Sequence, residues 1–414
     1  AANVEKLRAL ARRRLETDYG CKTCLLQEGC LRGCMAAAVC LCGDPLGDDG
    51  ECEYRKLQFL GFDLQGMMKK QRAGGTGDDG KGPGFRCFRR WRSSEWEEGS
   101  EMLVSYEGTM EKIRALAEGS RPDSETARVL YERRCLPLLS PSEIPEGKAE
   151  ACRARSVLNR VCLRERYAAC RGVFEALEAG GIPYAVIKGA VLSEAAYGDV
   201  FARHSGDVDI LLRRKDLGAV KEILLERGFQ QGYVAPEGVK PYSRESLIFQ
   251  SAMNLDVNLD IFWGESGRRA DMEYVLSQWE EKELFGVPFR RLSPAMEFIA
   301  LCMHHYKDMN SLYLLSQGGF RLDEVCDIAF YLQNSPPETE TLLEEGRRLD
   351  VLDYVYFCVW YANAVFPLPA VKTYLKALDG AKTFDLTPFY GLNEKERREW
   401  RVPLAERLLN PNFP

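Results

Sequence analysis

Two aspartates alternate with apolar residues in the segment 206–212, Gly-Asp-Val-Asp-Ile-Leu-Leu. Side chains two residues apart share one face of a β-strand, so a strand here places Asp207 and Asp209 together. Val208, Ile210 and Leu212 then fill the opposite, core-facing side. Neighbouring carboxylates repel each other, and a bound divalent cation would relieve that repulsion. The same pattern also occurs on the polar face of an edge strand, so the motif alone leaves both interpretations open.

A second segment, 255–261, also alternates strictly between apolar and polar residues. We expect a strand over 255–262, with Asp256, Asn258 and Asp260 on one face. Paired beside the first strand, it would supply a third carboxylate, from Asp256 or Asp260, with Asp256 slightly favoured. Such an oxygen-rich site suits Mg²⁺ together with substrate phosphates. Metal ions held in this way can stabilise the attacking and leaving oxygens of a phosphoryl transfer.

Candidate phosphate contacts lie just upstream. Lys188 and Gly189 form a turn between an expected strand (182–187) and an expected helix (190–197), and a helix N-terminus presents free N–H groups to an anion. Arg203 is another candidate phosphate contact, although it could equally be an ordinary surface charge. Gly206, directly before the first aspartate, completes the candidate nucleotide-binding set.

The surrounding pattern mixes strands and helices. Further strand-like segments cover 208–212 and 246–250, and a helix is expected over 216–227. Apolar periodicity predicts helices on both sides of this α/β region, at 110–117, 126–139, 153–177, 294–307, 322–332 and 341–366. On that basis, 182–262 forms the sheet-bearing core between helical segments.

Three stretches of this core resemble the nucleotidyltransferase_5 family of the DNA polymerase beta-like superfamily: IPYAVIKGA from 182, YGD from 197 and RHSGDVDILL from 203. Ser293-Pro, LCMH (301–304) and LDEVCD (322–327) are similar to the family's helical half. The resemblance implies an α+β fold over 102–400, with a small mixed β-sheet core at about 180–265 flanked by helices and a helical part at about 290–400. It also implies that Asp207 and Asp209 bind metal. The turn at Lys188-Gly189 would replace the superfamily's Gly-Ser turn.

The activity that this resemblance implies is Mg²⁺-dependent transfer of a nucleotidyl group from a nucleoside triphosphate. The acceptor is unknown, and could be a small molecule, a peptide or a protein. A non-catalytic nucleotide-binding domain is the alternative, because Lys-Gly-Ala stands where relatives usually have Gly-Ser.

Seven of the fifteen cysteines fall between residues 21 and 52. The spacing suits a soft metal or an iron–sulfur cluster, with zinc and the absence of any metal as alternatives. The run C-x2-C-x5-C-x3-C followed by a later cysteine resembles the SPASM extension of radical SAM enzymes. It would assign Cys21, Cys24, Cys30 and Cys52 to one [4Fe–4S] cluster, and Cys34 to a second. We therefore expect a cysteine-rich segment at 1–66, followed by a linker at 67–101. The resemblance also implies an alternative function, in which the chain is the C-terminal part of a radical SAM peptide-modifying enzyme.

Composition limits the classes of binding partner and the cellular location that we expect for this chain. With 56 basic and 62 acidic residues the net charge is −6, which disfavours bulk binding of nucleic acid. The most apolar stretch, 354–371, contains Asn363 and two prolines, and predicts a core helix rather than a membrane span. No secretion signal is evident, and the eight scattered cysteines are typical of reduced buried thiols, so a cytoplasmic location is expected.

Overall fold

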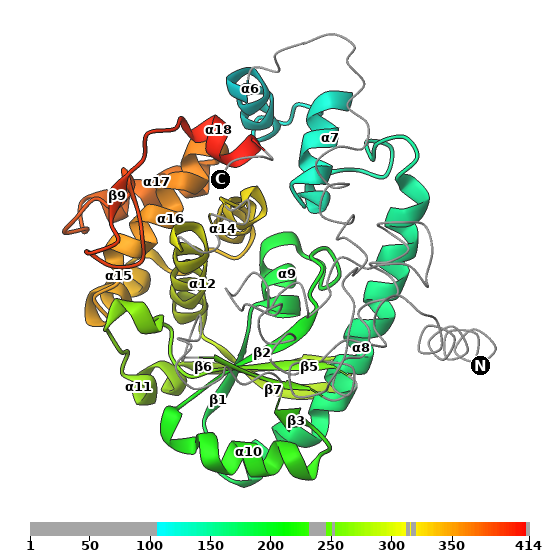
Figure 1. Cartoon of the computed structure of the whole chain (residues 1–414), viewed down its shortest axis with the longest axis vertical. Coiled ribbons are helices and arrows are strands. Elements are labelled where there is room, and N and C mark those ends of the chain that lie inside the picture. The colour runs from blue at the N-terminus through cyan, green and yellow to red at the C-terminus, as the bar shows by residue number, and fades with distance from the viewer. Residues whose placement is uncertain (1–105, 232–245, 251–252, 312–314, 316–319, 411–414) are drawn as a thin grey trace, which may run out of the picture. The chain divides into compact units, whose positions relative to one another are not determined.

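The computed structural model describes residues 106–231, 246–250, 253–311, 315 and 320–410 (Figure 1). Contacts divide the chain into 1–105 and 106–414, and the second unit is the one treated below. Its centre is a mixed sheet in the order β3-β4-β5-β2-β1-β7-β6. The strands are β1 (Tyr184–Ile187), β2 (Asp207–Leu212), β3 (Gln230–Gln231), β4 (Ser246–Gln250), β5 (Asn254–Asn258), β6 (Trp279–Leu284) and β7 (Val287–Leu292). A separate short pair joins β8 (Phe389–Tyr390) to β9 (Arg398–Glu399).

Helices cover both faces of the sheet. They are α6 (Tyr106–Leu116), α7 (Ser124–Glu132), α8 (Ala149–Ala179), α9 (Gly189–Tyr197), α10 (Leu217–Glu226), α11 (Met272–Ser277), α12 (Pro294–Asn310), α14 (Leu322–Asn334), α15 (Thr339–Arg348), α16 (Leu352–Val365), α17 (Pro369–Asp379) and α18 (Leu404–Leu409). Three short 3₁₀ turns lie at η2 (Leu136–Leu138), η3 (Arg214–Asp216) and η4 (Gly264–Ser266).

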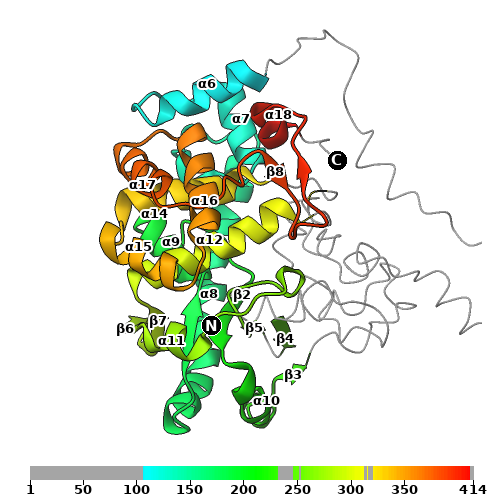
Figure 2. The same ribbon diagram turned by 90° about the vertical axis from the view of Figure 1, so that its left-hand side faces the viewer.

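Two hydrophobic cores, one on each side of the sheet, account for this arrangement. Val208, Ile210 and Leu212 of β2 belong to a core shared with α8 and α10, whereas Leu211 belongs to the core of the helical C-terminal half. Figures 1 and 2 show the C-terminal helices gathered on one side of the sheet, with α10 on the other. The predicted alternation of β2 is therefore confirmed, and its aspartates lie on the face toward the C-terminal helices.

The α+β fold predicted from the sequence is confirmed, while several boundaries were wrong. The strand expected over 255–262 ends at Asn258. The single helix expected over 341–366 is two helices, α15 and α16, separated where Asp350 adopts a positive φ of 54°. The apolar stretch 354–371 is likewise divided between α16 and α17 around Pro367, which has no N–H to continue a helix. The helix expected over 126–139 ends at Glu132 and is followed by the turn η2.

The described cysteines form no disulfide and most are buried, as predicted for buried thiols: Cys135, Cys170, Cys302, Cys326 and Cys358 are buried, and Cys152 and Cys162 are partly so. Across the described ranges, no helix is long and apolar enough to cross a membrane.

Candidate functional site

The parallel pairing of β2 with β5 brings three carboxylates together. Asp209 lies directly opposite Asp256 in the register, and Asp207 lies two residues earlier on the same strand. Leu255 and Val257 pack into the α8–α10 core, so Asp256 projects from the other face, on which Asp207 and Asp209 also lie. The alternation within each strand thus places the three aspartates on one face of the sheet, and the register between the strands makes them neighbours.

These carboxylates are partly desolvated and repel one another. Asp209 is only 7% exposed. Burial, followed by repulsion from Asp209 and Asp207, raises the pKa of Asp256 to about 8. Burial and Asp209 also raise the pKa of Asp207, against the attraction of Lys188. A neighbouring positive charge would stabilise the ionised form of carboxylates whose pKa values are raised in this way.

Lys188 supplies one such charge. Its Nζ lies 2.7 Å from Asp209 Oδ1, which also accepts a hydrogen bond from the Asn258 amide at 3.2 Å. Burial lowers the pKa of Lys188, but attraction to Asp209 and Asp207 outweighs it and leaves that pKa raised. The ammonium group therefore remains charged while it lies against the carboxylates.

The turn that carries Lys188 is tightly built. Lys188 has a positive φ of 56°, an uncommon conformation for a side-chain-bearing residue, and α9 begins at the next residue. Gly189 also has a positive φ (49°), and a Cβ there would lie 3.3 Å from Ser205 Oγ. Ser205 in turn donates a hydrogen bond to the backbone oxygen of Asp207 at 2.9 Å. The glycine thus lets the N-terminus of α9 approach the segment that enters β2.

The other sequence-predicted residues lie in different surroundings. Arg203 pairs with the buried Asp327 at 2.9 Å, in a cluster that also contains Tyr197 and His305. Asp260 lies beyond the end of β5, where its carboxylate accepts hydrogen bonds from the backbone of Phe262 and Ala270.

Gly206 directly precedes β2, and a Cβ at Gly206 would meet nothing within 4 Å. The geometry therefore brings together Lys188, Gly189, Asp207, Asp209 and Asp256. It places Arg203 in a buried ion pair and Asp260 in a loop.

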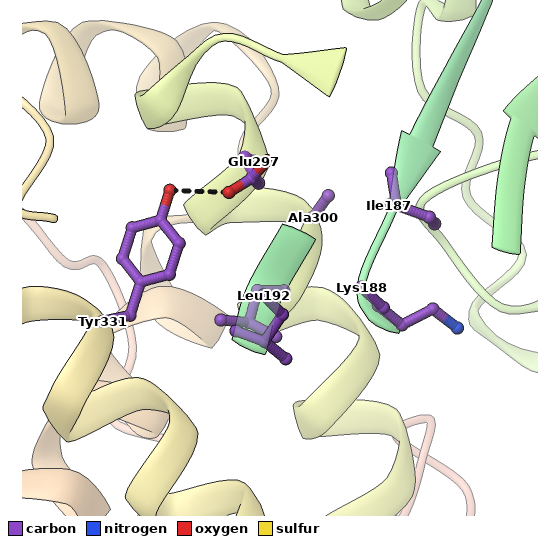
Figure 3. A pocket seen from close by; sticks show the side chains of 7 residues that line it. Ile187, Lys188, Leu192, Glu297, Ala300 and Tyr331 are labelled. Carbon is purple, nitrogen blue, oxygen red and sulfur yellow. Dashed lines mark hydrogen bonds between the residues drawn. The ribbon is translucent and has the colours of Figure 1, made fainter. Parts of the chain in front are cut away.

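Two pockets adjoin Lys188, between the sheet and α12. Figure 3 shows the first, where the Tyr331 hydroxyl donates to Glu297 Oε1 at 3.0 Å and Ala300 and Leu192 form the apolar wall. The second is lined by polar groups from both sides, including Asn258 and Asp260 from the sheet side, and His304 and Lys307 from α12. Sequence reasoning did not assign Asn258 or Lys307 to the site, although Lys307 is, with His304 and Asp308, one of three polar residues of α12 that are not buried.

Comparison with known proteins identifies the family. A family model described as an uncharacterised nucleotidyltransferase matches residues 134–367, more than half of the chain. The chain belongs to this nucleotidyltransferase family. No curated protein matches it significantly.

Among solved structures, the antibiotic-resistance factor ANT(2'')-Ia is 14% identical, with a TM-score of 0.30, and the match covers 44% of this chain and 89% of that one. An antigenic nucleotidyltransferase-like protein from Paracoccidioides brasiliensis is 16% identical, with a TM-score of 0.28, and the match covers 46% and 92% of the two chains.

The donor atoms of this nucleotidyltransferase-family chain match Mg²⁺ in chemistry. Asp207, Asp209 and Asp256 offer carboxylate oxygens, and burial together with mutual repulsion raises the pKa of Asp207 and of Asp256. Their side chains do not form a closed coordination group, and the described residues contain no cluster of three or more His, Cys, Asp or Glu arranged to hold a metal. The cysteines predicted to bind an iron–sulfur cluster (Cys21, Cys24, Cys30, Cys34 and Cys52) and the linker at 67–101 lie outside the described residues.

Proposed function

We propose that this chain transfers a nucleotidyl group from a nucleoside triphosphate to an acceptor hydroxyl in a Mg²⁺-dependent reaction. The observation that carries the proposal is the register of Asp209 opposite Asp256, with Asp207 on the same face and the N-terminus of α9 beside them. Family membership supports nucleotidyl transfer as the class of reaction. The acceptor is a small molecule, a peptide or a protein that carries a nucleophilic oxygen.

Each residue has a defined task in this proposal. Asp207 and Asp209 hold the Mg²⁺, which would neutralise phosphate charge and orient the reacting phosphorus. Lys188 and the Gly189 amide bind the triphosphate at the start of α9. Asp256, kept ionised by the positive charge that Mg²⁺ would place beside it, accepts the proton of the acceptor hydroxyl as the oxygen–phosphorus bond forms and pyrophosphate leaves. Of the two candidates for the third carboxylate, we favour Asp256, because the Asp260 carboxylate is already used by two backbone N–H groups.

Calorimetric titration of ATP, CTP, GTP and UTP, with and without Mg²⁺, tests this proposal without knowledge of the acceptor. We expect at least one triphosphate to bind in a Mg²⁺-dependent manner, and the double variant Asp207→Asn/Asp209→Asn to lose that binding. The exposed Asp379→Asn variant on α17 is the matched control, since Asp379 pairs with Lys382 far along the chain from β2. Unchanged binding by the double variant would refute the assignment of the two aspartates.

A non-catalytic nucleotide-binding role is the second candidate. It is favoured by one specific contact, because the Lys188 ammonium already lies on Asp209 Oδ1, an oxygen that the transferase proposal gives to Mg²⁺. Pyrophosphate release separates the two roles. Triphosphate binding with no pyrophosphate release, across acceptor classes that include a cell extract, would support the non-catalytic role.

A further inference from the structure

Helix α12 forms the wall of the second pocket opposite the sheet. Its lining residues, Ala300, Met303, His304 and Lys307, follow the i, i+3, i+4, i+7 spacing of one helix face. Most of this helix is buried, so two polar residues, His304 and Lys307, at the end of this face are unusual for a purely structural helix. His304 and Lys307 therefore face the pocket that Lys188 and Asn258 line from the sheet side.

Neighbours on the same helix hold the Lys307 ammonium in place. Its Nζ lies 3.2 Å from Asp308 Oδ1 and 3.4 Å from His304 Nδ1, and His304 Nε2 lies 3.3 Å from Asp308 Oδ2. Burial, together with the charges of Lys188 and Lys307, holds the pKa of His304 well below its usual value. The neutral imidazole can then accept from Lys307 at Nδ1 and donate to Asp308 from Nε2. Lys307 remains partly accessible, with 22% of its side chain exposed.

Lys188 and Lys307 reach the second pocket from two different elements. Lys188 lines it from the turn before α9 and lies 2.7 Å from Asp209, and Lys307 lines it from α12. Two ammonium groups that converge beside a set of carboxylates form a site for an anion whose counter-cation those carboxylates would hold. A nucleoside triphosphate with its Mg²⁺ has this distribution of charge.

We propose that Lys307 is a second phosphate-binding residue, which contacts the triphosphate in the pocket between the end of β5 and α12. The inference deepens the proposed function and rests on it. It assigns a binding role to the helical C-terminal half, so that the nucleotide is held between the sheet and α12 rather than by the sheet alone.

The test uses the full chain with Mg²⁺ and the triphosphate that binds most tightly among ATP, CTP, GTP and UTP. We expect Lys307→Ala to weaken triphosphate binding by about ten- to a hundredfold, the range for loss of a charged hydrogen bond. The affinity for the corresponding nucleoside, measured by competition, should change less than twofold. Lys307→Arg, which keeps the charge, should retain most of the triphosphate affinity. Lys372→Ala on α17, whose side chain is exposed, is the matched control and should bind as the wild type does.

The outcomes separate this inference from the proposed function. If the wild type binds triphosphate and Lys307→Ala binds it equally well, the inference is wrong and the proposed function stands. An equal loss of nucleoside and triphosphate binding would place Lys307 at the sugar or base and overturn the phosphate assignment. If the wild type binds no triphosphate, both proposals fall together. Equal thermal unfolding midpoints of wild type and Lys307→Ala would exclude a folding defect as the cause of any loss.

Discussion

The ion pair between Arg203 and Asp327 allows a sharp test, because the sequence and the structure give Arg203 different roles. The sequence offers Arg203 as a candidate phosphate contact or an ordinary surface charge, whereas the structure places its Nε 2.9 Å from a carboxylate whose side chain is 1% exposed. Asp327 also accepts a hydrogen bond from the Tyr197 hydroxyl at 2.8 Å, and His305 Nε2 lies 3.4 Å away. The structure therefore predicts that Arg203 mainly stabilises the fold.

The magnitude follows from burial. Arg203→Ala would leave the Asp327 carboxylate buried with only the tyrosine and histidine beside it, and loss of one partner of a buried pair costs about 3–5 kcal/mol. Because 22% of the Arg203 side chain is exposed, water can replace part of the interaction, and we expect the lower end, about 3 kcal/mol. The same substitution in an exposed pair, Arg128→Ala next to Glu132, should cost about 0.5 kcal/mol or less.

Urea denaturation of the two variants and the wild type measures these differences. Burial raises the pKa of Asp327, but Arg203, His305 and Tyr197 outweigh it, so the folded-state pKa is lowered. A carboxyl with a depressed folded pKa stabilises the fold above its unfolded pKa, near 4, and loses that contribution as the pH falls through the folded value. The gap between wild type and Arg203→Ala should therefore be complete at pH 7 and shrink in acid. A variant as stable as the wild type that no longer binds triphosphate would refute the structural role and restore the phosphate contact.

Two further predictions concern the carboxylate site. The raised pKa of Asp256, about 8, means that the folded chain keeps a proton that the unfolded chain releases near pH 4, so folding stability falls by up to about 1.4 kcal/mol per pH unit between these values. In EDTA, Asp256→Asn should therefore become more stable than wild type as the pH rises from 6 to 8.5, as measured by urea denaturation; a constant difference would contradict the raised pKa. Gly189→Ala should destabilise the chain by about 1 kcal/mol and weaken triphosphate binding, because φ is positive and the new Cβ meets Ser205. Gly218→Ala, where a Cβ meets nothing within 4 Å, is its control, and equal effects of the two would refute the argument.

Local periodicity predicted the centre of the fold and missed its ends. The alternation in β2 and β5 was sufficient to place Asp207, Asp209 and Asp256 on one face, because the strand period is exactly two. The alternation continues past Asn258 to Asp260, but the chain turns there, and Asp260 accepts hydrogen bonds from the backbone of Phe262 and Ala270. A hydrophobic pattern cannot show where backbone groups stop pairing with a neighbouring strand. The hairpin of β6 and β7 was missed for a related reason, since β6 is a polar edge strand with little apolar signal.

The roles of the cations depended on partners distant in sequence. Arg203 lies four residues before Asp207 and looked like a site residue, yet its partner Asp327 comes from α14, more than a hundred residues later. No sequence motif includes Lys307, yet α12 carries it to the pocket that Lys188 and Asn258 also line. One signal was available: in a helix whose other residues are mostly buried, His304, Lys307 and Asp308 are polar at i, i+3 and i+4, on a single face. Such a row of polar side chains must meet either water or another polar surface, and the acidic face of β2 and β5 was a polar surface that the sequence had already predicted.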